Sequence, residues 1–79
     1  MTGKEALRHA MKEKHLTQQE VANRAGYMRQ SNVSEILRSD NPRIDKMVQI
    51  LNACGYDLVM VDREKPGEQI VIEAGEKEG

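Results

Sequence analysis

Residues 16–37 read LTQQEVANRAGYMRQSNVSEIL and contain two helix patterns separated by one glycine. Thr17 and Glu20 have the spacing of a capping box, in which the hydroxyl accepts from a backbone amide and the carboxylate reaches back. A short helix is therefore expected to run from this point to Ala25. Gly26 stands where a left-handed residue ends a helix, which predicts a tight turn.

The second helix of this segment is expected at residues 30–38, with one apolar and one polar face. Val33, Ile36 and Leu37 point inward at helical spacing. Two short helices joined by a glycine turn are helix-turn-helix organisation. The outer face is rich in amides, hydroxyls and charges, supplied by Gln30, Ser31, Asn32, Glu35 and Arg38.

This polar face has the chemistry needed to read DNA bases. The major groove is about 12 Å wide and admits one α-helix, and amides, hydroxyls and carboxylates can all pair with base edges there. The first residues of such a helix lie deepest in the groove. We therefore expect double-stranded DNA to be contacted at its bases by Gln30, Ser31, Asn32 and Glu35. The alternative is a solvated face of a protein-interaction module.

Helix patterns also flank this segment on both sides. Thr2 and Glu5 form another capping box ahead of an apolar stripe, which predicts a helix to about residue 14. A further helix is expected over residues 44–54, with Ile44, Met47, Val48 and Leu51 turned inward.

After Gly55 the sequence changes from a helical to a β pattern. Apolar runs at residues 58–61 and 70–72 flank a Pro-Gly pair, which predicts a β-hairpin with its turn at residues 65–68. Runs without strict alternation indicate strands covered on both faces, which so small a bundle cannot provide alone. We therefore expect a second subunit to contact the hairpin, at Leu58, Met60, Val61, Ile70 and Ile72.

These patterns predict a mainly α fold of four to five short helices followed by a C-terminal β-hairpin. We divide the chain into a helix-turn-helix domain at 1–55, a dimerisation hairpin at 56–74 and a disordered charged tail at 75–79. A chain of 79 residues buries only about 60% of its unfolded surface, so a partner subunit would add to a marginal core.

The net charge of −1 conceals an asymmetry. Residues 1–46 contain nine Lys or Arg against six Asp or Glu, whereas residues 47–79 contain three against seven. A basic N-terminal part and an acidic C-terminal part are typical of a module that binds a polyanion, followed by a segment that does not contact it.

Other function classes are not supported by the sequence. No apolar run approaches the roughly 18 residues of a membrane span, and no signal peptide pattern is present, so a cytoplasmic protein is expected. The lone Cys54 is expected to be a small buried hydrophobe, with redox sensing as the alternative. His9 and His15 lack the spacing of a helical metal pair, and no catalytic motif is present, so neither a cofactor nor an enzyme is expected.

Residues 16 to about 55 resemble the λ-repressor/Cro-like helix-turn-helix family, also called the XRE family. The matching residues are Leu16-Thr17-Gln18, Glu20-Val21-Ala22, Gly26, Gln30-Ser31 with Val33 and Ile36, Asn41-Pro42 and Leu51 to Gly55. The resemblance implies that the Gln opening the second helix touches phosphate, that the third helix reads bases and that the following loop contacts the backbone. It also implies pairing of a C-terminal β element between subunits. We assign phosphate contacts to Thr17, Gln18, Arg29, Arg38, Asn41 and Arg43, with a guanine as the alternative partner of Arg29.

The turn of this chain departs from the family pattern by one residue. Two residues usually separate the glycine from the Gln that opens the third helix, whereas Tyr27, Met28 and Arg29 make three. Alignment without a gap would bury Asn32 and expose Val33, at a cost of about 1–3 kcal/mol for the unpaired amide. An inserted residue is therefore the better interpretation. Met28 is expected to be a hydrophobic staple, with a thymine-methyl contact as the alternative.

We expect the chain to be a homodimeric transcriptional regulator, a repressor at a palindromic operator. The alternative is an antitoxin-like protein that neutralises a toxin-like partner and represses its own operon, which the acidic stretch after residue 57 suggests. A structural adaptor that binds no DNA is a third possibility, and acidic potential over the third helix would mark it.

Overall fold

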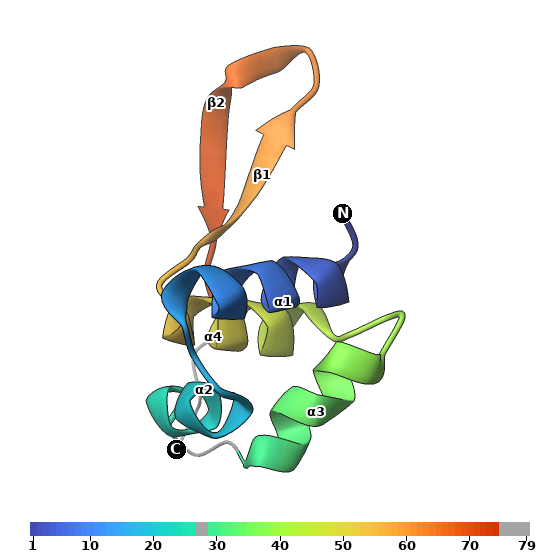
Figure 1. Ribbon diagram of the computed structural model, residues 1–79. Coiled ribbons are helices and arrows are strands. Elements are labelled where there is room, and N and C mark those ends of the chain that lie inside the picture. The colour runs from blue at the N-terminus through green and yellow to red at the C-terminus, as the bar shows by residue number, and fades with distance from the viewer. Residues whose placement is uncertain (27–28, 75–79) are drawn as a thin grey trace, which may run out of the picture.

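The structure, a computed structural model, describes residues 1–26 and 29–74. Within these residues the chain forms helices followed by a pair of strands (Figure 1). This confirms the predicted mainly α fold with a C-terminal hairpin. None of the described helices is long and apolar enough to span a bilayer. The elements are α1 (Gly3–Lys14), α2 (Gln18–Arg24), α3 (Gln30–Arg38), α4 (Ile44–Ala53), β1 (Leu58–Asp62) and β2 (Lys65–Ile72).

Reciprocal side-chain caps start the first two helices, as predicted. The Thr2 hydroxyl accepts from the Glu5 amide at 3.3 Å, and Glu5 Oε1 accepts from the Thr2 amide at 2.8 Å. Thr17 and Glu20 form the same pair at 3.1 and 2.9 Å. Gly26 follows α2 with a φ of 92°, a left-handed conformation that glycine adopts without steric cost, so the predicted turn glycine is confirmed.

The two capping carboxylates make the helix starts sensitive to acid. Hydrogen bonds from Thr2 and Thr17 lower the pKa of Glu5 and Glu20 respectively. A pKa lower in the folded than in the unfolded state gives stability above the unfolded pKa that is lost as the pH falls through the folded one. We expect a Glu5→Gln, Glu20→Gln variant to lose stability less steeply than the wild type between about pH 5 and about pH 3. Thermal unfolding followed by circular dichroism measures both slopes, and parallel slopes would contradict this expectation.

The core is assembled from aliphatic side chains of all four helices. Leu7, Val21, Val33 and Ile50 are fully shielded from solvent, and no polar or charged residue among those described is buried. Cys54 closes the core with 1% of its surface exposed, and burial raises the pKa of its thiol. The prediction that it is a small buried hydrophobe is confirmed.

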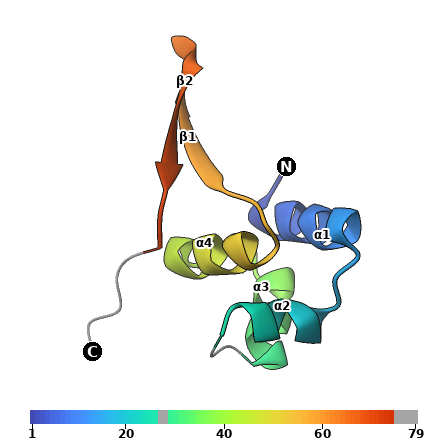
Figure 2. The same cartoon turned by 90° about the vertical axis from the view of Figure 1, so that its left-hand side faces the viewer.

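The helices form two layers, and the hairpin stands on one of them. α1 and α4 lie side by side, with α2 and α3 packed beneath them, while β1 and β2 rise from the opposite side (Figures 1 and 2). Tyr56 and Leu58, at the foot of the hairpin, pack against the core. The outer part of α3 and the hairpin therefore point in opposite directions.

The predicted hairpin is present, but its predicted turn is wrong. The strands are antiparallel, with Met60 opposite Ile70, and the turn is Arg63-Glu64 rather than residues 65–68. Asp62 Oδ1 accepts from the amide of Glu64 at 2.8 Å, which closes this two-residue turn locally. The Pro-Gly pair lies inside β2, opposite the irregularity after Val61, because proline fits a strand at an edge or a bulge.

One prediction about an apolar side chain also requires correction. Ile44 is predicted to point inward, but 60% of its surface is exposed. It occupies the first position of α4, and the buried residues of that helix begin only at Met47. The hairpin residues that are predicted to contact a second subunit lie on both faces of the hairpin, because cross-strand pairing and the two-residue period put Val61 on the face opposite the other four. One face carries Leu58, Met60, Ile70 and Ile72, and the other carries Val59, Val61 and Val71.

Candidate nucleic-acid interface

α3 is held against the bundle by its apolar face and leaves its polar face in solvent. Val33 is fully buried and Asn32 is only half-buried, so Val33 and not Asn32 occupies the core position, as predicted. Gln30, Ser31 and Glu35 are exposed. Three of the four predicted base-reading side chains are therefore accessible to a large ligand.

Asn32, the fourth, is half-buried and is used by the helix itself. Its Oδ1 accepts from the backbone amide of Arg29 at 2.9 Å, so it satisfies a donor at the start of α3. The amide nitrogen of Asn32 remains able to donate. The exposed start of α3 is therefore formed mainly by Gln30 and Ser31, while Asn32 holds the helix entry in place.

A short hydrogen bond joins the two helices of the motif. Ser34 Oγ donates to Gln18 Oε1 at 2.6 Å, from the middle of α3 to the first residue of α2. The Gln18 oxygen is thereby occupied, which leaves its amide hydrogens as donors suited to a phosphate oxygen. Thr17, the preceding predicted phosphate contact, is exposed and caps α2. Ser34 was missed in the sequence, although it lies one helical turn after Gln30 on the same face.

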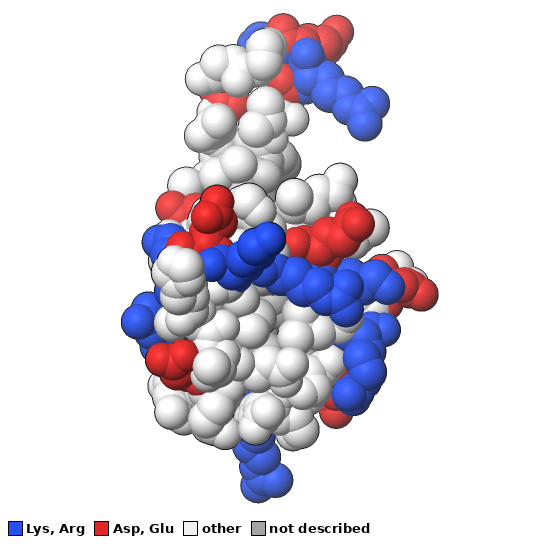
Figure 3. All heavy atoms as spheres, viewed as in Figure 1, with Lys and Arg blue, Asp and Glu red and all other residues white. Residues whose placement is uncertain are grey.

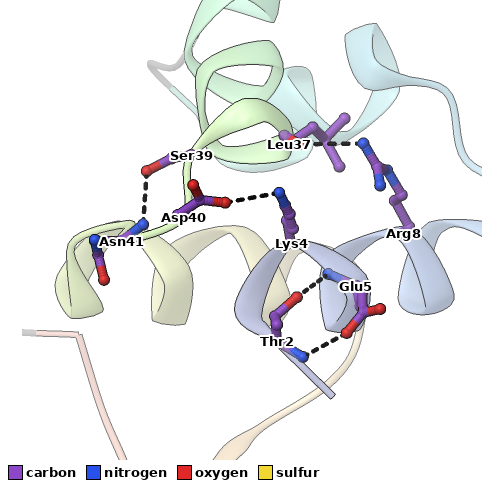
Figure 4. A network of polar contacts seen from close by, with 8 residues as sticks. All are labelled: Thr2, Lys4, Glu5, Arg8, Leu37, Ser39, Asp40 and Asn41. Carbon is purple, nitrogen blue, oxygen red and sulfur yellow. Dashed lines mark hydrogen bonds and ion pairs between the residues drawn. The ribbon is translucent and has the colours of Figure 1, made fainter.

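α1 anchors the end of α3 and the loop that follows it (Figure 4). Arg8 Nη2 donates to the carbonyl oxygen of Leu37 at 3.2 Å, and Lys4 Nζ pairs with Asp40 Oδ1 at 2.8 Å. The hydrogen bond and charge of Lys4 lower the pKa of Asp40, which stays ionised and paired. Neither Lys4 nor Arg8 was predicted to matter, because contacts between elements distant in sequence leave no local pattern.

The predicted phosphate-binding residues of this loop are exposed. Arg38 ends α3, and Asn41 and Arg43 follow it. The Asn41 amide donates to Ser39 Oγ at 3.1 Å, which shapes the loop. Arg43 pairs with Asp45 at 3.2 Å, but its side chain is 78% exposed and so can exchange this partner for a phosphate.

A groove of about 250 Å³ separates α3 from the start of α4. Lys46 adds a cation there that the sequence analysis did not single out. The lining residues are Asn32, Glu35, Ile36, Ser39, Asn41, Pro42, Arg43 and Lys46.

Positive charge predominates around α3 in the described part of the chain. Arg24, Arg29 and Arg38 are all exposed at the ends of α2 and α3. Asp40 and Asp45 are each paired with a cation, so Glu35 is the remaining nearby carboxylate. Figure 3 shows Lys and Arg atoms in a band over α1 and along the edge of the bundle where α3 lies. This distribution opposes the adaptor hypothesis, which requires acidic potential here.

The histidines, the turn and the tail are the other segments that the sequence draws attention to. His9 and His15 are exposed, and the described residues contain no group of three or more potential metal ligands. Tyr27 and Met28 of the turn, and the predicted tail at 75–79, lie outside the described residues.

An exposed polar helix, braced by a shorter one and surrounded by cations, defines a helix-turn-helix protein of the DNA-binding class. The family model described as Helix-turn-helix matches residues 7–61. The match covers more than half of the chain, so the chain belongs to this family, and the resemblance to Cro/C1-type (XRE) regulators is confirmed. It is a family of DNA-binding regulatory domains and not of enzymes. No curated protein and no solved structure matches the chain significantly.

Proposed function

We propose that the chain is a homodimeric, sequence-specific DNA-binding protein that represses transcription at a roughly palindromic operator. The observation that carries this proposal is the exposed start of α3, where Gln30 and Ser31 point away from a core sealed by Val33. A side chain that reads bases must protrude and must also be held still. The Gln18–Ser34 bond and the two anchors from α1 provide that rigidity.

We assign two kinds of DNA contact to this surface. Gln30, Ser31 and Glu35 read base edges, with Asn32 donating from the groove beside them. The backbone is held by Thr17, Gln18, Arg29, Arg38, Asn41, Arg43 and also Lys46. Phosphate contacts supply sequence-independent affinity and fix the register of the helix, while base contacts supply discrimination.

Dimerisation would double the number of base contacts that the protein makes. A single short helix makes few base contacts, and two helices related by a two-fold axis double them across a palindrome. The hairpin is on the side of the bundle opposite α3, so a dimer formed through it leaves α3 free (Figure 1).

The test is selection of bound duplexes from a random pool, followed by affinity measurements over a range of salt. We expect an enriched sequence with two-fold symmetry and an affinity that falls steeply with salt, since bound phosphates release counterions. Absence of any enriched sequence together with a flat salt response would refute DNA-binding regulation by this chain.

A second candidate is an antitoxin-like protein that also binds a partner protein. The second hairpin face, formed by Val59, Val61 and Val71, is exposed and apolar, which favours it. Purification of the chain from its native source should then yield a second protein in fixed stoichiometry. If the chain is recovered by itself, the first proposal stands without this addition.

A further inference from the structure

An open, largely apolar groove lies between the helices and the foot of the hairpin, bordered by the loop that follows α3. Its volume is about 410 Å³. The start of α1, the loop before α4, α4 itself and the first residue of β1 form its walls. The apolar part of the wall includes Ala6, Pro42, Ile44, Met47, Leu51 and Leu58.

Ile44 is a member of this wall, within a helix, whose exposure the fold of one chain does not explain. It is 60% exposed at the first position of α4, whereas Met47 and Leu51, one and two turns further on, are buried. The first turn of a helix favours acidic and small polar residues, and a solvated β-branched side chain gains nothing there. An aliphatic residue at this position therefore indicates a surface that becomes covered.

The groove continues onto the hairpin through Leu58. Leu58 lines the groove and also belongs to the hairpin face that carries Met60 and Ile70. Met60 and Ile70 are 54% and 58% exposed, and the stem of the hairpin is almost free of charged atoms (Figure 3). The groove and the apolar part of this hairpin face thus form two adjoining arms that meet at Leu58, and Met60 and Ile70 also line a second hollow that contains charged residues near the turn.

The size of this surface favours a second copy of the chain as its occupant. A stable interface takes about 20–30 residues a side, and the hairpin consists of a five-residue and an eight-residue strand. The hairpin by itself is too small, and the adjoining groove supplies the missing area. Two-fold symmetry lets the hairpin of each copy occupy the groove of the other, so both arms are covered at once.

We propose that the Met60–Ile70 face of each hairpin lies over the Ile44 groove of the partner copy, so that subunits exchange hairpins reciprocally. This inference rests on the homodimer of the proposed function and assigns its interface.

Sedimentation equilibrium measures the dimer dissociation constant directly. Ile44→Asp and Met60→Asp should each raise it about 100-fold or more, because the dimer contains every substitution twice and each removes a buried apolar contact. Both residues are exposed within one chain, so the helical fold is retained, as circular dichroism will verify. Glu13→Gln, an exposed site near the other end of α1, should change the constant by less than about threefold.

Cross-linking tests the pairing itself. Chains carrying only Ile44→Cys are mixed with tagged chains carrying only Met60→Cys and treated with a short bismaleimide. The mixed product should form, and it should be absent when Glu13→Cys replaces Ile44→Cys. Native Cys54 is 1% exposed, and the wild-type chain serves as the blank.

The outcomes separate this inference from the proposed function. A wild-type dimer that resists Ile44→Asp and gives no mixed product would overturn hairpin exchange and leave the homodimer intact. A wild type that stays monomeric at all concentrations would overturn both the exchange and the homodimer. Duplex selection tests DNA binding independently of either result.

Discussion

Val33→Asn is expected to lower the free energy of unfolding by about 2.5–6 kcal/mol. The side chain of Val33 is fully buried on the inner face of α3. The substitution removes about 1.5–3 kcal/mol of apolar burial and leaves an amide unpaired at a further 1–3 kcal/mol. The sum, about 2.5–6 kcal/mol, is a large part of the roughly 4–12 kcal/mol expected for the free energy of unfolding of a domain of 79 residues. Urea unfolding followed by circular dichroism measures the loss.

Ser31→Asn is the matched control for this substitution. It introduces the same side chain two residues earlier, on the exposed face, and should change the free energy of unfolding by less than about 0.5 kcal/mol. Equal effects at the two positions would mean that α3 is rotated relative to the core, and the assignment of its outer face would fail.

Gln30→Ala is expected to abolish much of the discrimination between the selected operator and unrelated duplexes. One bidentate amide–base pair accounts for about 1–3 kcal/mol, and a dimer loses it in both half-sites. The ratio of specific to nonspecific affinity should therefore fall by about 30-fold or more, while affinity for unrelated duplexes changes little. Competition binding at fixed salt measures this ratio.

Arg43→Ala is the contrasting variant, because Arg43 is assigned to phosphate. It should weaken binding to all duplexes by a similar factor and reduce the salt dependence by about one counterion per subunit. Uniform loss in both variants would refute the division of the surface into base-reading and phosphate-binding residues.

Local sequence signals predicted most of the helical fold. The capping boxes at Thr2 and Thr17 and the glycine at position 26 act through neighbours within four residues, so their spacing alone locates the helix ends. The insertion in the turn was resolved by a rule about burial, namely that Val33 and not Asn32 belongs in the core.

Features that depend on distant contacts could not be predicted. The pairing of Gln18 with Ser34 and of Lys4 with Asp40 joins residues that only the tertiary fold brings together. The helical period predicts that Ile44 lies on the inner face of α4, but the buried residues of that helix begin only at Met47. In the hairpin, the turn is closed by the hydrogen bond from the Glu64 amide to the Asp62 side chain, and Pro66 and Gly67 lie within β2 instead of forming the turn. Each failure arose where a general preference competed with a specific contact.

The measurement that tests the central claim most directly is mapping of backbone amide signals by nuclear magnetic resonance as the selected duplex is added. The account predicts the largest shifts at the start of α3, at Gln30 and Ser31, with further shifts at Gln18 and Arg43 and little change along the hairpin. Shifts confined to the hairpin, with the amides of α3 unmoved, would show that the duplex binds elsewhere and would contradict the account.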